Sequence, residues 1–231
     1  MSGIKRVVSI GAHSLDAELL GGPLLLKYAK NGAAGAGAHC TLIHVTQGRL
    51  EDPAATEAAK KAYLQELLNQ NKRAAEKLGC DTLWLGYVSN NMPSTEEFQK
   101  RLAAYFIEEK VELVITHWRG SMHPRHINTH DAVSGAVKEL RKRGNPIKLL
   151  YGETFEDLVG FIPQAYFSLS EAEKEQWFSA LNEYQVFRGE INDFPYSDYY
   201  TTNGKIRAVE SGNKDFTVCY MYAGLIEQEI F

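Results

Sequence analysis

Hydrophobic and polar positions along the chain form two alternating kinds of segment. Short apolar runs rich in β-branched residues are typical of buried parallel strands, and they occupy residues 5–12, 39–48, 81–88, 111–117 and 147–153. Between these runs, apolar residues recur at helical spacing, which predicts helices over residues 16–31, 53–78, 94–109 and 127–143. Asp52 is the expected N-cap of the second of these helices.

Strands that alternate with helices need crossover connections, which place successive strands parallel to one another. The pattern therefore predicts an α/β fold, a Rossmann-like, doubly wound, mostly parallel sheet with helices on both faces. In such sheets ligands bind outside the carboxyl ends of the strands. We expect the functional residues of this chain just after its strand ends.

The alternation stops after residue 153. A capping box at Ser170 and Glu173 opens an amphipathic segment that predicts one helix over residues 170–190. The tail at 192–231 is rich in tyrosine and ends in short strand-like pieces. Its aromatic residues either line a sugar site or bury a sheet edge or a subunit interface. We expect a single domain over 1–231, with a core at about 5–153 and a C-terminal extension at 154–231.

Composition excludes some classes of partner. The formal net charge is −4 and no segment is strongly basic, which argues against nucleic-acid binding. The apolar stretches are far shorter than the roughly 20 residues of a membrane helix, so no membrane association is expected. The N-terminus lacks the apolar core of a signal peptide, and the three cysteines lie far apart, which favours a cytoplasmic protein with reduced thiols. A homo-oligomer is compatible with the sequence.

Histidines gather after two of the predicted strands. His13 and Asp16 follow the first strand, and the fourth strand leads into a segment with four histidines: His117, His123, His126 and His130. A catalytic zinc site takes three protein ligands and keeps a fourth position for water, and His13, Asp16 and one histidine of 123–130 would supply such a set. The spacing alone is equally compatible with structural roles, with Asp16 as a helix N-cap.

Two stretches resemble motifs of the LmbE/PIG-L family of zinc-dependent N-acetylglucosaminyl deacetylases. GAHSLDAELLGG at 11–22 is similar to the first motif, which usually reads A-H-P-D-D-x-E followed by a glycine pair. HPRHINTHDAV at 123–133 is similar to the second motif, a histidine pair that opens a helix. HVTQG at 44–48 and AAEKLG at 74–79 also resemble family segments, so the resemblance covers about residues 5–150.

The resemblance implies roles for individual residues. The metal ligands would be His13, Asp16 and His126, holding Zn²⁺ or another divalent ion. His123 would act on the tetrahedral intermediate or the leaving amine, so His123 and Asp16 are the expected catalytic residues. Glu18 would be structural or would hold a ligand in orientation. His117 and His130 match neither motif and are expected to make local hydrogen bonds.

The first motif departs from the family at the general base. Leu15 stands where the family has the aspartate that takes a proton from the metal-bound water, and Ser14 replaces a proline. A positioned base is worth about 10²–10⁴-fold in rate, whereas a metal alone lowers the pKa of its water to about 7. Losing the base should therefore cripple hydrolysis without abolishing it. Unless another group takes over the role, hydrolysis is slow; Glu153 and Asp157, after the fifth strand, are candidates for that group.

The resemblance predicts a metal-dependent deacetylase or amidase that acts on an N-acyl amino sugar or a similar small amide. Arg49 and Arg125 are the expected substrate contacts; many family members have an aspartate at the position of Arg125. Leu15 also favours an alternative, a catalytically silent relative that keeps the metal pocket to bind a sugar or another metabolite. A Rossmann-type nucleotide-binding domain is disfavoured because no G-x-G-x-x-G turn follows the first strand.

Overall fold

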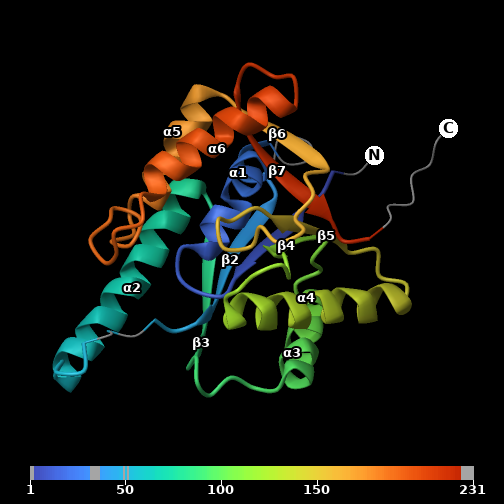
Figure 1. Ribbon diagram of the computed structural model, residues 1–231. Coiled ribbons are helices and arrows are strands. Elements are labelled where there is room, and N and C mark those ends of the chain that lie inside the picture. Colours follow the sequence, from blue (N-terminus) through green and yellow to red (C-terminus); the bar gives the residue numbers. More distant parts are fainter. Residues whose placement is uncertain (1–2, 32–36, 49, 51, 225–231) are drawn as a thin grey trace.

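The computed structural model describes residues 3–31, 37–48, 50 and 52–224 (Figure 1). Its centre is a seven-stranded sheet in the order β3-β2-β1-β4-β5-β7-β6. The strands are β1 (Arg6–Gly11), β2 (His39–Thr46), β3 (Asp81–Tyr87), β4 (Leu113–His117), β5 (Lys148–Gly152), β6 (Ala165–Leu169) and β7 (Phe216–Tyr222). Strands β1 to β5 are parallel, and β7 runs antiparallel to both β5 and β6.

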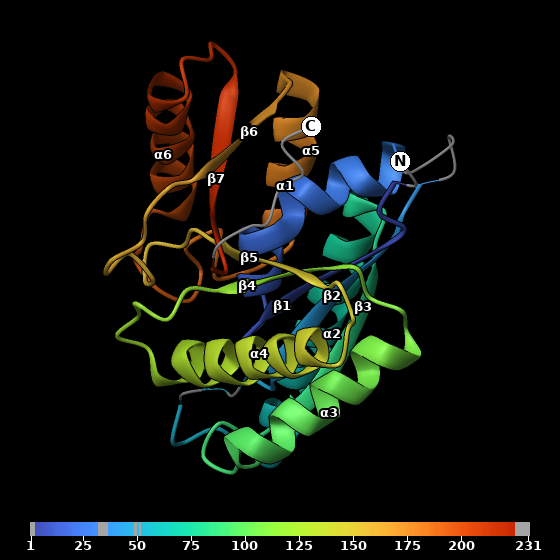
Figure 2. The same ribbon diagram turned by 90° about the vertical axis from the view of Figure 1, so that its right-hand side faces the viewer.

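Helices cover both faces of the sheet (Figure 2). One face carries α1 (Asp16–Asn31), α2 (Glu57–Leu78), α5 (Glu171–Leu181) and α6 (Tyr196–Glu210), and the other carries α3 (Thr95–Glu108) and α4 (Pro124–Lys142). Every residue of β1 is buried, because this strand lies in the middle of the sheet and packs on both layers. The predicted mostly parallel α/β fold is confirmed.

Three predicted helix boundaries are wrong. Helix α2 begins at Glu57, because Thr56 rather than Asp52 accepts the capping hydrogen bond, from the backbone N–H of Ala59. Helix α4 begins at Pro124, three residues before the predicted start at Ile127. The helix predicted over 170–190 ends at Leu181, and turns follow it.

Helix α6 in the tail was not predicted. Its sequence YSDYYTTNGKIRAVE contains threonine, asparagine and glycine, which are weak helix formers. Tertiary packing explains the helix: Gly204 faces β7 so closely that a Cβ atom there would lie 2.2 Å from the ring of Phe216. The C-terminal extension therefore adds two antiparallel strands, β6 and β7, to the sheet, and α6 packs against β7.

Two further observations concern the cysteines and the helices of the described residues. All three cysteines are free, and Cys40 and Cys219 are buried. Among the residues that the structure describes, no helix combines the length and the apolar composition that a membrane crossing requires.

Candidate metal centre

The turn after β1 brings His13 and Asp16 together. Leu15 adopts a left-handed backbone conformation with φ +83°, which costs a non-glycine residue about 1–3 kcal/mol, and its carbonyl accepts the first hydrogen bond of α1 from Leu19. The Leu15 side chain is 3% exposed and packs in the hydrophobic core. The turn closes because Asp16 Oδ2 accepts a hydrogen bond from the backbone N–H of His13 at 2.8 Å.

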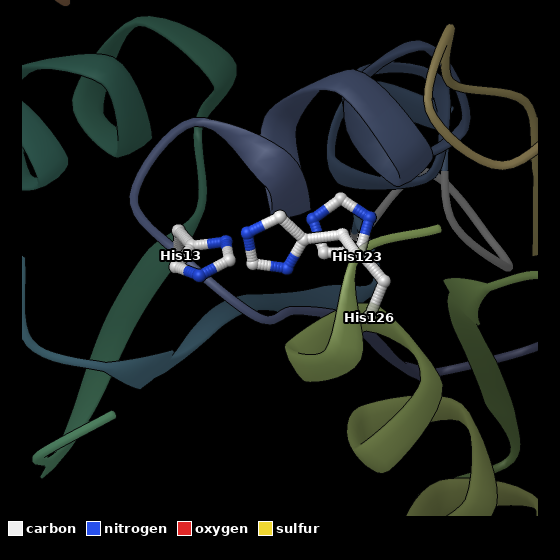
Figure 3. A group of neighbouring side chains, drawn as sticks. All are labelled: His13, His123 and His126. Carbon is white, nitrogen blue, oxygen red and sulfur yellow. The ribbon is translucent and has the colours of Figure 1, made fainter. Parts of the chain in front are cut away.

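The first turn of α4 supplies His123 and His126. His123 is the N-cap, and its Nδ1 accepts a hydrogen bond from the backbone N–H of Arg125 at 3.3 Å. The ring centroids of His13, His123 and His126 lie 4.6–5.4 Å apart, and Figure 3 shows the three imidazoles gathered between the β1–α1 turn and the start of α4. The structure therefore brings the two predicted motifs to one place.

Asp157 orients two histidines by accepting a hydrogen bond from each. Its carboxylate accepts hydrogen bonds from Nδ1 of His117 at 2.7 Å and from Nδ1 of His126 at 2.8 Å, and it is fully buried. Because Nδ1 of His126 is bonded, its Nε2 points toward Asp16 Oδ2 at 3.5 Å. Burial alone would lower the pKa of His126, but Asp16 and Asp157 raise that pKa to about 10. In the protein without metal, a proton thus occupies the nitrogen that a metal ion would take.

The donor set fits a divalent cation. Nε2 of His126 is buried, and within the described part of the chain it has no hydrogen-bond partner. Asp16 Oδ2 lies 3.1 Å from Nδ1 of His13 and 3.5 Å from Nε2 of His126. Ligand atoms of a tetrahedral zinc site lie about 3.3 Å apart when each is 2.0–2.1 Å from the metal. Asp16 therefore lies at ligand spacing from both His13 and His126. Within the described residues, ligand atoms gather within 4.8 Å of one another in two sets that share His126: His13, His123 and His126, and Asp16, His117 and His126.

His117 and His123 differ from these three residues. Nε2 of His117 accepts a hydrogen bond from the backbone N–H of Ala12 at 3.0 Å, so this nitrogen is already engaged, although it also lies 3.5 Å from Asp16 Oδ2. His123 uses Nδ1 as an acceptor, so its neutral ring carries a proton on Nε2. Burial, together with the neighbouring His13 and His126, lowers the pKa of His123 to about 4. His123 is thus a neutral hydrogen-bond donor at neutral pH.

Neither carboxylate predicted to replace the general base is free to do so. Glu153 accepts hydrogen bonds from Asn203 and Arg207 and forms an ion pair with Arg207, so its carboxylate is already engaged. Asp157 is occupied by the two histidines described above. Asp157 does reach the site, but through the far nitrogen of His126. The segment GETFED offers three carboxylates, and only tertiary contacts distinguish them.

The third carboxylate, Glu156, was missed. Its Oε2 lies 3.7 Å from Nε2 of His126, and its side chain is half-buried at the site. Burial, reinforced by the negative charges of Asp16 and Asp157, raises the pKa of Glu156 above its ordinary value.

Aromatic residues of the tail anchor this loop. The ring of Phe155 stacks on that of Phe194 with centroids 4.0 Å apart, and it contacts Tyr196 and Tyr199 edge-on at 5.7 and 5.9 Å. Tyr196 and Tyr200 are buried within the chain. These aromatic residues therefore pack against the loop that carries Glu156.

The remaining predicted residues lie as follows. Glu18 is fully buried and bonds His44 at 3.0 Å and the Tyr184 hydroxyl at 2.6 Å, so it holds none of the predicted ligands; Asp157 does so instead. Nη1 of Arg125 lies 3.4 Å from Asn128 Oδ1, in the first turn of α4. Arg49 lies outside the described residues. His130 bonds the carbonyl of His117 locally at 2.9 Å.

Known structures share this fold over nearly the whole chain. The 4-carboxy-2-hydroxymuconate hydratase GalB from Pseudomonas putida KT2440 aligns with TM-score 0.78 and 14% identity over 99% of both chains. The N,N'-diacetylchitobiose deacetylase from Pyrococcus horikoshii aligns with TM-score 0.71 and 16% identity over 94% of this chain and 83% of that chain. The zinc inhibited form of teicoplanin deacetylase Orf2 aligns with TM-score 0.69 and 17% identity over 95% and 99%.

These structural alignments show that the proteins share a fold. The family is shown by a match of the sequence to a family model. A comparison with curated protein sequences found no match. The family model described as PIG-L, GlcNAc-PI de-N-acetylase, matches residues 8–137, which is more than half of the 231 residues. The match spans the turn with His13 and Asp16 and the helix start with His123 and His126. The chain therefore belongs to the GlcNAc-PI de-N-acetylase (PIG-L) family, as its two motifs predicted.

Proposed function

We propose that this protein is a metal-dependent amidase that deacylates an N-acyl amino sugar or a similar small amide. The observation that carries this proposal is the buried Nε2 of His126, which makes no hydrogen bond within the described residues and faces Asp16 at a spacing suited to a shared metal ion. Membership of a de-N-acetylase family and the deacetylases among the structural neighbours support the reaction class.

His13, Asp16 and His126 would hold the ion, since Asp16 lies at ligand spacing from both histidines; the zinc inhibited form of one neighbour supports zinc as an ion that this fold can bind. A bound divalent ion polarises a carbonyl oxygen and lowers the pKa of a water molecule to about 7. Asp157 keeps His126 in orientation through its hydrogen bond to Nδ1.

The other site residues supply hydrogen bonding and proton transfer. Water adds through its oxygen to the amide carbon, and Oε2 of Glu156 accepts the proton that the water loses. Nε2–H of His123 donates a hydrogen bond to the oxyanion that develops on the carbonyl oxygen. When the C–N bond breaks, Glu156 returns its proton to the nitrogen, and the products are a carboxylic acid and an amine, which at neutral pH exchange a proton to give a carboxylate and an ammonium ion.

Glu156 is the proposed substitute for the general base that Leu15 replaces in the family motif. The base of the motif is missing, yet a carboxylate from a distant loop lies beside His126. This placement supports a hydrolytic protein over the silent relative that Leu15 alone would favour.

A second candidate is a hydratase that adds water to a carbon–carbon double bond conjugated to a carboxylate. It is favoured by Leu15 together with the TM-score of 0.78 to 4-carboxy-2-hydroxymuconate hydratase, higher than those of the two deacetylases compared above. Hydration also needs an activated water and a proton donor, but no amine leaves.

Product analysis tests both candidates. Zinc-loaded protein is incubated with a panel of N-acetyl amino sugars while amine release is measured, and with 4-carboxy-2-hydroxymuconate while loss of its conjugated ultraviolet absorbance is measured. We expect amine release that His126→Ala and Glu156→Gln lose. Absorbance loss without amine release would replace the amidase with the hydratase. Amine release no greater than that of His126→Ala would reject the amidase.

A further inference from the structure

A buried polar cluster begins in the first turn of α1, next to the turn that carries His13 and Asp16. Its members are Glu18, His44 and Tyr184, and all three are fully buried. We call these three residues the Glu18 cluster. The proposed reaction uses none of them, yet burying a carboxylate is costly unless hydrogen bonds compensate for the lost water.

The carboxylate of Glu18 has two hydrogen-bond donors. Nε2 of His44 donates to Oε1 of Glu18 at 3.0 Å, and the hydroxyl of Tyr184 donates to the same oxygen at 2.6 Å. The hydroxyl of Thr82 lies 3.3 Å from Nδ1 of His44 and can donate to it, which leaves the proton of the neutral ring on Nε2. The hydroxyl of Tyr184 also lies 3.1 Å from Oδ1 of Asn71. The cluster thus connects α1, α2, β2 and β3 to the segment that follows α5.

The Tyr184 hydroxyl reaches the turn that carries the proposed ligands. Burial raises the pKa of Tyr184 far above its ordinary value, and the nearby carboxylates of Glu18 and Asp16 raise it further. A hydrogen bond with the backbone of Leu15 acts in the opposite direction. Tyr184 therefore keeps its proton at neutral pH. Nε1 of Trp177 donates to the carbonyl of Glu18 at 2.9 Å, so a second aromatic residue of the C-terminal extension holds the same helical turn.

The start of α1 needs such support. Leu15 adopts its left-handed conformation at φ +83°, and a strained conformation persists only where the surroundings over-determine it. Oδ2 of Asp16, the next residue, lies 3.1 Å from Nδ1 of His13 and 3.5 Å from Nε2 of His126. Because Asp16 and Glu18 belong to one helical turn, a shift of Glu18 would move this oxygen relative to both histidines.

We propose that Tyr184 is a positioning residue for the candidate metal centre: by donating to Glu18, its hydroxyl holds the start of α1 and so keeps Asp16 at ligand spacing from both histidines. This inference rests on the ligand set of the proposed function and adds a role for the C-terminal extension. The three proposed ligands lie within residues 8–137, which the family model matches, whereas Tyr184 lies outside them. The segment after α5 would then complete a site whose ligands all come from the matched part of the chain.

The zinc affinity of Tyr184→Phe tests this role without relying on turnover. The phenyl ring keeps the packing and removes only the hydroxyl. We expect the dissociation constant for zinc to rise about tenfold, because outer hydrogen bonds that orient metal ligands are worth about 10–100-fold in affinity. It is measured against a chelator of known zinc affinity, below the unfolding transition. In the cobalt-substituted protein we expect the visible absorption bands of Co²⁺ to shift, since they report how the ligands are arranged. Glu18→Gln weakens the same hydrogen bond from its other end and should change both readouts in the same direction.

Tyr105→Phe is the matched control. Tyr105 lies on α3, and its hydroxyl accepts a hydrogen bond at 3.4 Å from Arg6, the first residue of β1, at the end of that strand opposite the metal centre. This variant should keep the wild-type dissociation constant and cobalt spectrum. Unchanged values in Tyr184→Phe, or equal changes in Tyr184→Phe and Tyr105→Phe, would overturn the positioning role and leave the proposed function intact. Failure of the wild-type protein to bind zinc would overturn the proposed function itself.

Discussion

The turn after β1 and the loop after β5 both end at the candidate metal centre, but they are built differently. The turn is local: Asp16 bonds the backbone of His13, and Leu15 fixes the backbone between them. The loop depends on distant residues, because Phe155 is held by Phe194 of the tail. In the proposed function the turn would supply ligands, whereas the loop would orient a ligand and supply a proton acceptor. Metal binding and turnover should therefore be separable by mutation.

The largest effect is expected where the two regions meet. His126 faces Asp16 from the turn and bonds Asp157 from the loop. His126→Ala should lose stoichiometric zinc after dialysis, measured by elemental analysis, and about 10³-fold or more of the activity, because a three-ligand site loses one ligand. His130→Gln is the control, since His130 lies one helical turn further along α4 and bonds a backbone carbonyl. Zinc retained by His126→Ala would refute the ligand assignment.

Glu156→Gln changes only the proposed proton acceptor on the loop after β5 and leaves the ligands of the turn unchanged. The amide keeps the shape of the side chain but cannot take a proton, so kcat should fall by about 10²–10⁴-fold. Zinc content should not change, because the ligands come from elsewhere. Glu153→Gln offers a comparison in the same segment: it should weaken the ion pair with Arg207 and lower the melting temperature. Equal losses of kcat in both variants would mean that Glu156 has no special role.

Asp157→Asn tests whether Asp157 holds the ring of His126 in the orientation that metal binding needs. An asparagine side chain accepts only one of the two histidine hydrogen bonds, so zinc affinity should fall by about 10–100-fold, measured by competition with a chromogenic chelator. Asp131→Asn removes an exposed carboxylate that pairs with Arg119, and it should leave the affinity unchanged. An unchanged affinity in Asp157→Asn would show that His126 keeps its orientation without this carboxylate.

The contrast between turn and loop also explains what the sequence could predict. Hydrophobic periodicity located the five parallel strands, and the motifs located His13, Asp16, His123 and His126, because strand ends of a parallel sheet meet at one edge. Glu156 was missed because its separation from Glu153 and Asp157 depends on Phe155 packing against a tail some 40 residues away. Helix α6, which continues that tail, forms through packing and not through propensity.

Leu15→Asp should have the smallest effect on activity, although it restores the aspartate of the family motif. The Leu15 side chain is buried in the core, so an aspartate there would enter apolar surroundings. We expect a loss of stability of about 2–4 kcal/mol, because a buried side chain is lost and a polar group takes its place. Aspartate tolerates the left-handed backbone better than leucine, which offsets a small part of this loss.

The activity of Leu15→Asp should stay within about twofold of the wild type, measured below the unfolding transition, because a group in the core adds nothing to the about 10²–10⁴-fold that a positioned base supplies. Leu15→Asn, which is equally polar but cannot take a proton, separates the loss of stability from any gain in catalysis. A large gain confined to the aspartate variant of an otherwise inert protein would favour the silent relative. It would also show that the turn can redirect residue 15 toward the metal centre, and Glu156 would then lose its role as the proton acceptor.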